Sequence, residues 1–386
     1  MADLSHRPIT LALFCKVVDN FGDIGICYRL ARQLTLEHQV EVTLWVDDLA
    51  SFQRICPEVD PGQSQQLVQQ IRVIHWNDQD VDCTSEQVAD IVIEFFGCEL
   101  PAAYIAAMKI RRPVWINLEG LCAEDWVESC HTLPSPQFTL TKYFYYPGFT
   151  AKTGGLLLES GLLQERDHYR QNPAQAREFL NGLGLSPEEQ AAQKVSLFCY
   201  PHAPVTELFR AWQNSPTPIT CLVPQGVAPQ QVQAFTGNQT RAGVRVTHGA
   251  LTVRVIPFLP QPDYDRLLWL CNVNFVRGED SFVRAQWAGR PFVWHIYPQD
   301  KNLHHVKLNA FLQRSGFAET SQNGLSLAWN EAGPITPDFA ALWQDFVTGR
   351  QKIANMALEW QSKLLTNGDL AANLMQFAAS VAQKPA

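Results

Sequence analysis

The stretch NVNFVRGEDSFVRAQWAGRPFVW, residues 272–294, decides the fold class. Its apolar run at 273–276 suits a buried parallel strand, and Ser281 suits the start of a helix. The corner at 288–291 ends this helix before a second strand at 292–295. A helix in this position directs its first N–H groups beyond the carboxyl edge of a sheet, where a diphosphate is stabilised. The stretch therefore predicts an α/β domain with an anion site at the helix tip.

Apolar runs of strand length alternate with helical patterns along the chain, which favours parallel sheets. A polar, helix-prone stretch separates two such halves, and a regular apolar stripe indicates helix near the end of the chain. We therefore expect two Rossmann-like doubly wound domains at 1–165 and 195–365, joined by a linker at 166–194. A C-terminal helix at 366–386 is expected to pack back on the N-terminal domain. Strands are predicted at 9–17, 40–46, 71–75, 91–95, 114–116, 195–200, 219–223, 253–257, 273–276 and 292–295.

Composition excludes several classes of function. The 386 residues suit two domains, and 30 basic against 38 acidic residues without a basic run argue against a nucleic-acid partner. The ten cysteines are scattered and form no C-x-x-C pair, which is typical of buried thiols in a reducing compartment. No apolar run approaches the roughly 20 residues that span a bilayer. We expect a cytoplasmic protein without a membrane partner.

Two carboxylates follow the first predicted strand, in the sequence DNFGDIG at 19–25. Gly22 allows a tight turn, but a phosphate-binding loop would not select Asp19 and Asp23, and the spacing is not the dinucleotide fingerprint. One interpretation makes Asp23 a helix cap and Asp19 a solvated turn residue. The other makes the loop, with Asn20, a site for a cationic acceptor.

Aromatic, amide and arginine side chains surround the opening stretch. Phe258 and Gln261 follow the strand at 253–257 and suit the face and edge of a base, although Phe258 equally suits a core position. Arg277 suits a diphosphate. Glu279 lies beside the predicted phosphate site, where a carboxylate is unfavourable unless it binds a hydroxyl or a cation.

Metal binding has little support. Asp78-Gln79-Asp80 and Asp263-Tyr264-Asp265 each spell D-x-D, but the first lies in a polar turn and the second opens a helix. The histidines near the second strand of the opening stretch lack partners at ligand spacing. We expect no metal and no cofactor.

Two blocks, VVDNFGDIGICYRLARQL and FVRGEDSFVRAQWAGRPFVWHIYPQ, together resemble the EarP family, bacterial protein-arginine rhamnosyltransferases that modify translation elongation factor P. The resemblance implies a GT-B glycosyltransferase whose two domains face each other across a cleft. It implies a metal-independent enzyme that moves rhamnose from dTDP-β-L-rhamnose to one arginine of elongation factor P, with inversion at the anomeric carbon. A monomer suits an enzyme that must bind another protein.

The resemblance also assigns roles to residues. Asp19 and Asp23 match the acidic pair of the family's N-terminal loop, and Glu279 matches its essential glutamate. We expect Asp23 to act as the base, Asp19 to hold the guanidinium or orient the loop, and Glu279 to position the sugar or the acceptor. The positions that match the nucleotide-sugar site are Phe258, Gln261, Arg277, Asp280, Ser281 and Tyr297, and Tyr200 is placed near the base.

Three alternatives remain open at this stage. A GT-B-like nucleotide-sugar epimerase would act on the donor alone, and a small-molecule glycosyltransferase would differ only in its acceptor. A non-catalytic module that docks elongation factor P would tolerate loss of Glu279.

Overall fold

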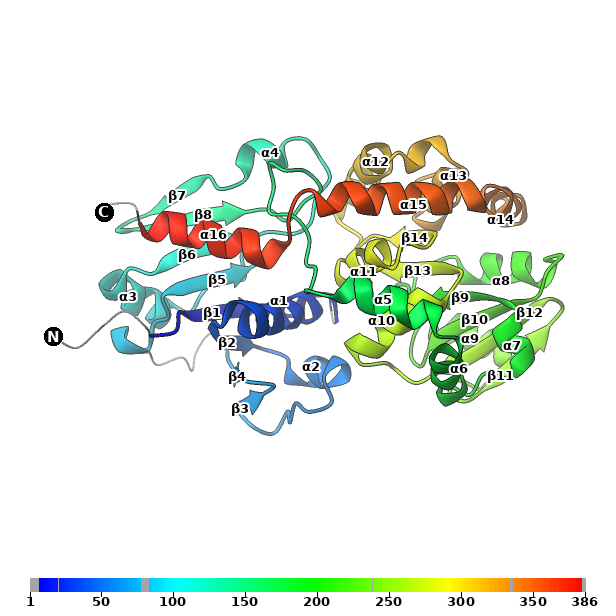
Figure 1. Ribbon diagram of the computed structural model, residues 1–386, viewed down its shortest axis with the longest axis horizontal. Coiled ribbons are helices and arrows are strands. Elements are labelled where there is room, and N and C mark those ends of the chain that lie inside the picture. Colours follow the sequence, from blue (N-terminus) through cyan, green and yellow to red (C-terminus); the bar gives the residue numbers. More distant parts are fainter. Residues whose placement is uncertain (1–6, 20, 78–82, 238, 334–335, 384–386) are drawn as a thin grey trace. The chain divides into compact units, whose positions relative to one another are not determined.

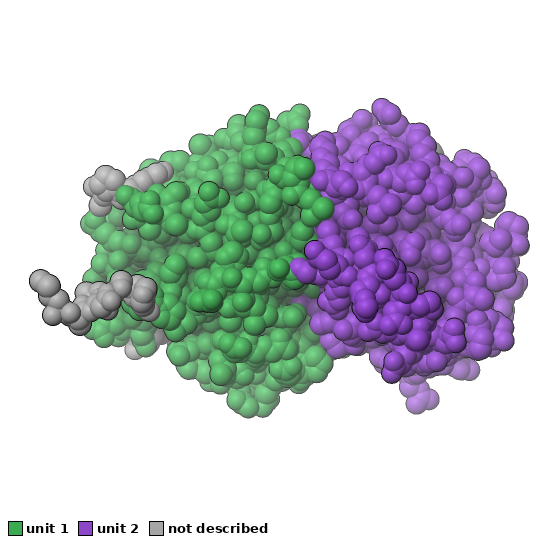
Figure 2. Space-filling model, in the orientation of Figure 1, with its two compact units in different colours: residues 1–160, 364–386 green, residues 161–363 purple. Residues whose placement is uncertain are grey.

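The structure is a computed structural model that describes residues 7–19, 21–77, 83–237, 239–333 and 336–383 of the chain. The chain forms two compact units (Figure 2). Unit 1 comprises Met1–Ser160 and Leu364–Ala386, and unit 2 comprises Gly161–Lys363. Unit 1 is therefore built from both ends of the chain.

An eight-stranded sheet forms the centre of unit 1, in the order β3-β4-β2-β1-β5-β6-β8-β7. The two outer pairs, β3 with β4 and β7 with β8, are antiparallel, and the strands between them pair in parallel. The strands are β1 (Thr10–Cys15), β2 (Glu41–Val46), β3 (Gln65–Val68), β4 (Ile71–His75), β5 (Ile91–Phe95), β6 (Val114–Leu118), β7 (Pro134–Gln137) and β8 (Leu140–Tyr145).

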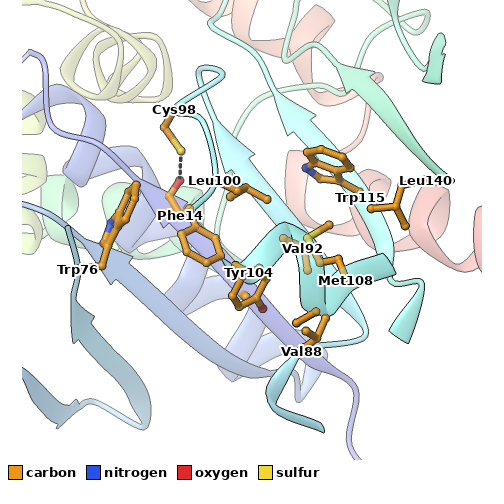
Figure 3. Packing of buried hydrophobic residues seen from close by; sticks show 12 residues of the cluster. Phe14, Trp76, Val88, Val92, Cys98, Leu100, Tyr104, Met108, Trp115 and Leu140 are labelled. Carbon is orange, nitrogen blue, oxygen red and sulfur yellow. Dashed lines mark hydrogen bonds between the residues drawn. The ribbon is translucent and has the colours of Figure 1, made fainter. Parts of the chain in front are cut away.

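Helices cover both faces of this sheet (Figure 1). On one face α1 (Gly22–His38) packs on β1, β2 and β4 and contacts both α2 (Leu49–Ile55) and α16 (Leu370–Ala382), and α16 reaches β6. On the other face, α3 (Ala102–Arg111) contributes Tyr104 and Met108 to an aromatic cluster with Phe14 of β1 (Figure 3). Burial on both sides explains why β1 reads as an unbroken apolar run. The remaining helices of unit 1 are α4 (Val127–Cys130) and the 3-10 turn η1 (Ser85–Gln87).

Unit 2 contains a six-stranded sheet in the order β11-β12-β10-β9-β13-β14, parallel except for the edge strand β11. Strand β13 alternates between the two faces of this sheet. The Asn274 side chain donates to the Leu268 carbonyl of α10 (Gln261–Leu270) at 3.0 Å. The Phe275 ring contacts Trp212 of α8 (Val205–Gln213) and Trp329 of α13 (Gln322–Trp329). The strands are β9 (Gln193–Leu197), β10 (Ile219–Pro224), β11 (Arg245–His248), β12 (Leu251–Ile256), β13 (Val273–Arg277) and β14 (Phe292–His295).

The helices of unit 2 are α5 (Leu162–Gln171), α6 (Pro173–Gly182), α7 (Pro187–Ala191), α8 (Val205–Gln213), α9 (Pro229–Thr236), α10 (Gln261–Leu270), α11 (Asp280–Ala288), α12 (Leu303–Ser315), α13 (Gln322–Trp329), α14 (Phe339–Thr348) and α15 (Arg350–Leu365), with the 3-10 turns η2 (Asp300–Asn302) and η3 (Phe317–Glu319). Helix α15 runs to the boundary with unit 1.

The segment at 166–194, expected to be a linker, differs from that expectation. It forms most of α5 with α6 and α7, and it belongs to unit 2. Its leucines explain the difference, because Leu180, Leu183 and Leu185 are buried in one cluster with Leu267 of α10. The polar residues between them concealed this apolar stripe. The unit boundaries therefore fall after residue 160 and before residue 364.

Two further properties concern the whole chain. All ten cysteines are free thiols, and eight of them are buried. Within the described residues, no helix combines the length and apolar character needed to cross a membrane.

Candidate active site

The turn between β13 and α11 is the predicted anion site. Strand β13 ends at Arg277, and Gly278 then adopts a φ of +58°, a conformation that favours glycine. Helix α11 starts at Asp280 with Glu279 as its N-cap residue, so Ser281 lies inside the helix instead of capping it. The Ser281 hydroxyl accepts from the Arg277 N–H at 3.0 Å and donates to the Arg277 carbonyl at 2.5 Å. This pair of bonds fixes the start of the helix against the end of the strand.

The first turn of α10 lies beside the first turn of α11. Gln261 is buried, and its Nε2 donates to Asp280 Oδ2 at 3.3 Å. Gln261, predicted to bind the base, thus also connects the two helix starts. Both helix N-termini carry the partial positive charge of their backbone N–H groups at this edge of the sheet.

Two aromatic rings contact the guanidinium of Arg277. The guanidinium carbon lies 4.6 Å from the ring centroid of Phe198 and 4.7 Å from that of Tyr200. The Phe258 ring is 6.2 Å from that of Phe198 and is half-buried, between the two environments predicted for it. Cation–π contacts with these two rings orient the planar fork of Arg277. Phe198 escaped the sequence analysis, although its two-residue spacing from Tyr200 is the signal that both side chains share a face.

Tyr297, His202 and His295 lie next to the ring of Tyr200. The Tyr297 ring is 5.6 Å from the Tyr200 ring and remains 41% exposed, while Tyr200 is buried. His295 Nδ1 accepts from the Tyr200 N–H at 3.2 Å, and burial, with the nearby His202 and Arg277, lowers the pKa of His295 well below its ordinary value. His295 is therefore neutral, and Tyr297 offers an exposed aromatic face.

The D-x-D motif at the start of α10 is engaged by arginines. Asp265 is buried and accepts from Arg284 Nε at 3.0 Å and Nη2 at 2.7 Å, and Asp263 accepts from Arg266 at 2.7 Å. The other D-x-D motif, at 78–80, lies outside the described residues. Across the part of the chain that the structure describes, no group of three or more His, Cys, Asp or Glu side chains is placed to hold a metal ion.

The acidic loop of unit 1, which contains Asp19 and Asp23, lies at the carboxyl end of β1. Asp23 is 4% exposed, and its Oδ2 accepts from the N–H groups of Val18 and Asp19, both at 2.8 Å. Asp47, directly after β2, accepts from the Val17 N–H at 2.8 Å. Two carboxylates thus bind three successive backbone N–H groups. The pKa of Asp23 is raised above its ordinary value. Burial is the largest cause and the charge of Asp47 adds to it, while the two N–H bonds act in the opposite direction.

Asp23 is not the cap of α1, since Phe21 occupies that position and makes no side-chain capping bond. Asp19 is half-buried, and its carbonyl accepts from the Gly22 N–H at 2.7 Å. A Cβ atom at Gly22 would lie 2.8 Å from Asp19 Oδ2, so any other residue at this position would have to displace the Asp19 carboxylate from the helix start. Asn20 lies outside the described residues.

The predicted site residues therefore form two groups, one in each unit. Unit 1 brings Asp19, Gly22 and Asp23 together. Unit 2 gathers the others at the carboxyl ends of its strands: Tyr200, Phe258, Gln261, Arg277, Glu279, Asp280, Ser281 and Tyr297.

The family profile described as elongation factor P rhamnosyltransferase EarP matches residues 11–379. The chain belongs to this family. A protein-arginine rhamnosyltransferase of Pseudomonas putida is 45% identical over 377 residues, which cover 95% of this chain and 98% of that protein. The protein of the same description from Pseudomonas aeruginosa is 43% identical over 376 residues, with the same two shares covered.

Solved structures agree with this membership. One solved structure concerns EarP-mediated arginine glycosylation of translation elongation factor EF-P, and its chain shares 33% sequence identity with this one. The match covers 96% of this chain and 99% of the matched chain, with a TM-score of 0.67. The glycosyltransferase VinC in complex with dTDP covers 98% of this chain and 100% of its own at 12% identity, with a TM-score of 0.52, and indicates the fold alone. The chain has the GT-B fold and is a glycosyltransferase, of the protein-arginine rhamnosyltransferase class.

Proposed function

We propose that this protein transfers rhamnose from dTDP-β-L-rhamnose to an arginine side chain of translation elongation factor P, with inversion at the anomeric carbon. One observation carries the proposal. Carboxylates dominate the loop at the carboxyl edge of the unit 1 sheet, while the corresponding edge in unit 2 presents helix N-termini and Arg277. The first environment suits a guanidinium and the second a diphosphate.

The donor site is assigned to unit 2. The starts of α10 and α11 stabilise the diphosphate through backbone N–H groups and helix dipoles. Arg277 adds a positive charge, and the exposed face of Tyr297 or the half-buried ring of Phe258 stacks on the base. These groups stabilise the negative charge that grows on the departing nucleoside diphosphate.

The acceptor arginine is assigned to the acidic loop of unit 1. A guanidinium has a pKa of about 12.5 to 13.8 and is a poor nucleophile while protonated. Asp19, which is half-exposed, binds the cation, and Asp23 accepts the proton from the reacting nitrogen as the new C–N bond forms. The raised pKa of Asp23 makes it a stronger base than an ordinary aspartate.

Direct attack by the arginine nitrogen requires no covalent intermediate with the enzyme. The nitrogen forms the bond to the anomeric carbon while the bond from that carbon to the diphosphate oxygen breaks, and its electron pair leaves with dTDP. A single displacement inverts the configuration. To Glu279, the N-cap residue of α11, we assign the binding of a sugar hydroxyl and the balancing of positive charge at the anomeric carbon.

All ten cysteines are free thiols, which supports a reducing compartment, and we assign the reaction to the cytoplasm.

The test is the intact mass of elongation factor P after incubation with dTDP-rhamnose and this protein. We expect one added deoxyhexose, and none when the donor or the enzyme is omitted. Donor consumption without any mass change on the factor would contradict the proposal and favour an epimerase or a small-molecule glycosyltransferase.

A further inference from the structure

The turn that follows β5 contains a strained aromatic residue. Phe96 has a φ of +54°, Gly97 of +60° and Glu99 of +56°. A left-handed conformation is ordinary for glycine but unfavourable for phenylalanine, and such residues persist where the surrounding structure requires them. The structure does hold this turn firmly, because the Phe96 N–H donates to the Leu118 carbonyl at 2.9 Å and the Gly97 N–H to Asn117 Oδ1 at 2.9 Å.

This turn lies next to the acidic loop. Strand β5 pairs in parallel with β1, with Phe14 opposite Glu94, so both strands end at the same edge of the sheet. The Cys98 thiol donates to the Phe14 carbonyl at 3.5 Å and ties the turn to β1 (Figure 3). Burial raises the pKa of the Cys27 thiol, and its neighbours Cys15, Asp23 and Cys98 add to that rise, so the end of the turn and the carboxylate share one neighbourhood.

The ring of Phe96 is only partly covered. It stacks on Phe95 with the ring centroids 3.9 Å apart and the planes inclined by 23°, and the residue remains 37% exposed. An exposed aromatic ring on a strained backbone contributes little to folding. The turn shares its sheet edge with the carboxylates of the acidic loop. This combination suits a ligand that is both planar and cationic, because a guanidinium stacks on an aromatic face while its N–H groups bind carboxylates at its edge.

We propose that Phe96 is an acceptor-binding residue whose open ring face stacks on the guanidinium of the acceptor arginine, while Asp19 and Asp23 bind the edge of that group. The inference rests on the proposed function and deepens it, since it names a further residue that selects arginine. A flat face favours arginine over lysine, whose compact ammonium group cannot stack in this way.

Phe138 provides a matched control. It also has a left-handed backbone, with a φ of +56°, and it is 98% exposed. It lies in the hairpin turn between β7 and β8, where Gln137 pairs with Leu140 at the amino end of β8, so it is at the opposite edge of the sheet from the acidic loop. Lys109 Nζ lies 5.7 Å from its ring centroid.

The experiment compares Phe96→Gly, Phe96→Leu, Phe96→Tyr and Phe138→Gly. For each variant we would measure the KM for elongation factor P, the Kd for dTDP and the thermal midpoint. The two glycine variants should show small and similar shifts in midpoint, because each replaces a strained side chain with the residue that suits the backbone. The KM should rise roughly tenfold in Phe96→Gly and Phe96→Leu, as expected for loss of a desolvated cation–π contact. Phe96→Tyr and Phe138→Gly should keep the wild-type KM, and all four should keep the wild-type Kd for dTDP.

Any of three results would overturn the inference and leave the proposed function intact. These are a wild-type KM for elongation factor P in Phe96→Gly, a wild-type KM in Phe96→Leu, or a KM in Phe138→Gly that rises as much as in Phe96→Gly. A wild-type enzyme that adds no sugar to the factor would refute the proposed function, and the inference would fall with it.

Discussion

The carboxylate of Asp23 combines a structural and a proposed chemical role at the scale of a single residue. Its Oδ2 binds the N–H groups of Val18 and Asp19 and so shapes the loop that presents Asp19. The same carboxylate is 4% exposed, and burial raises its pKa. Because a raised pKa in the folded state means that the charged form is disfavoured there, this ionised group lowers the stability of the fold at neutral pH.

Asp23→Asn should separate the two roles. The amide oxygen still accepts from both N–H groups, and the cost of burying a charge disappears. We therefore expect the free energy of unfolding at pH 7, measured in urea, to equal or exceed that of the wild type. Turnover should fall at least about 100-fold, because the base is lost. Retained turnover would remove Asp23 from the base role, and a large loss of stability would show that the charge itself shapes the loop.

Asp47 allows a test by pH. The base must be deprotonated to act, so activity is lost as the pH falls through the raised pKa of Asp23, above the value of about 3.9 for an ordinary aspartate. The negative charge of Asp47 contributes to this rise. In Asp47→Asn, which keeps an acceptor for the Val17 N–H, the acid limb of kcat/KM should move to lower pH. An unmoved limb would contradict the assignment of that limb to Asp23.

Among the elements, the pairing of α10 with α11 determines the geometry of the proposed donor site. The buried side chains of Arg284 in α11 and Asp265 in α10 are joined by two hydrogen bonds. At the far end of α11, Arg166 donates to the Trp287 carbonyl at 2.6 Å and Arg170 donates to the Ala288 carbonyl. Cations at the C-terminus of a helix complement its dipole. These contacts hold the middle and the C-terminus of α11, and the bonds from Ser281 to Arg277 fix its N-terminus at the end of β13.

Asp265→Leu should be strongly destabilising, since it leaves the Arg284 charge buried without its partner. Removing one member of such a pair costs about 3–5 kcal/mol. Urea denaturation of unit 2, followed by tryptophan fluorescence, measures the change. The double variant Asp265→Leu, Arg284→Met should recover most of the loss, because no charge is then buried. A single variant within about 1 kcal/mol of the wild type would show that the pair contributes little.

The return of the chain to unit 1 is the main feature at the scale of the whole molecule. The chain leaves unit 1 after residue 160 and re-enters it at residue 364. The Leu370 N–H donates to the Leu156 carbonyl at 3.0 Å, and Gln33 of α1 donates to the Leu158 carbonyl at 2.9 Å and to Asp369 at 3.1 Å. Helix α16 then buries Leu370 and Leu374, and its Phe377 ring lies 5.4 Å from that of Tyr145.

Deleting residues 369–386 should therefore destabilise unit 1 and spare unit 2. We expect the calorimetric transition of unit 1 to move to lower temperature, because α1 and β6 lose the apolar cover of α16. The Kd for dTDP should stay near the wild-type value. Loss of dTDP binding in the truncated chain would contradict the assignment of the donor site to unit 2 alone.

The parallel cores of both units were predictable from sequence, but their edges were not. Strands buried on both faces read as apolar runs, and β4, β5 and β14 begin and end at the predicted residues. Strands β3, β7, β8 and β11 escaped prediction because antiparallel edge hairpins such as QQLV and PSPQ are short and polar. The linker prediction failed for a related reason, since a half-buried helical stretch has a largely polar sequence.

The sequence also indicated which residues to expect at the candidate site, but it did not indicate the contacts among them. Motif positions indicated which residues follow each strand, and the structure places Arg277 and Tyr200 in direct contact. The bonds from Ser281 to Arg277 and from Asp23 to the loop depend on backbone geometry that no spacing reveals. Phe96 was missed because the feature that distinguishes it is a backbone angle.

The most direct measurement is a fragmentation mass spectrum of elongation factor P after incubation with this protein and dTDP-rhamnose. We expect a single deoxyhexose on the guanidinium of one arginine, and no deoxyhexose when the Asp23→Asn variant replaces the wild-type enzyme. A sugar on a serine, threonine or asparagine, or an unmodified factor, would contradict the proposal that the acidic loop binds and deprotonates an arginine side chain for glycosyl transfer.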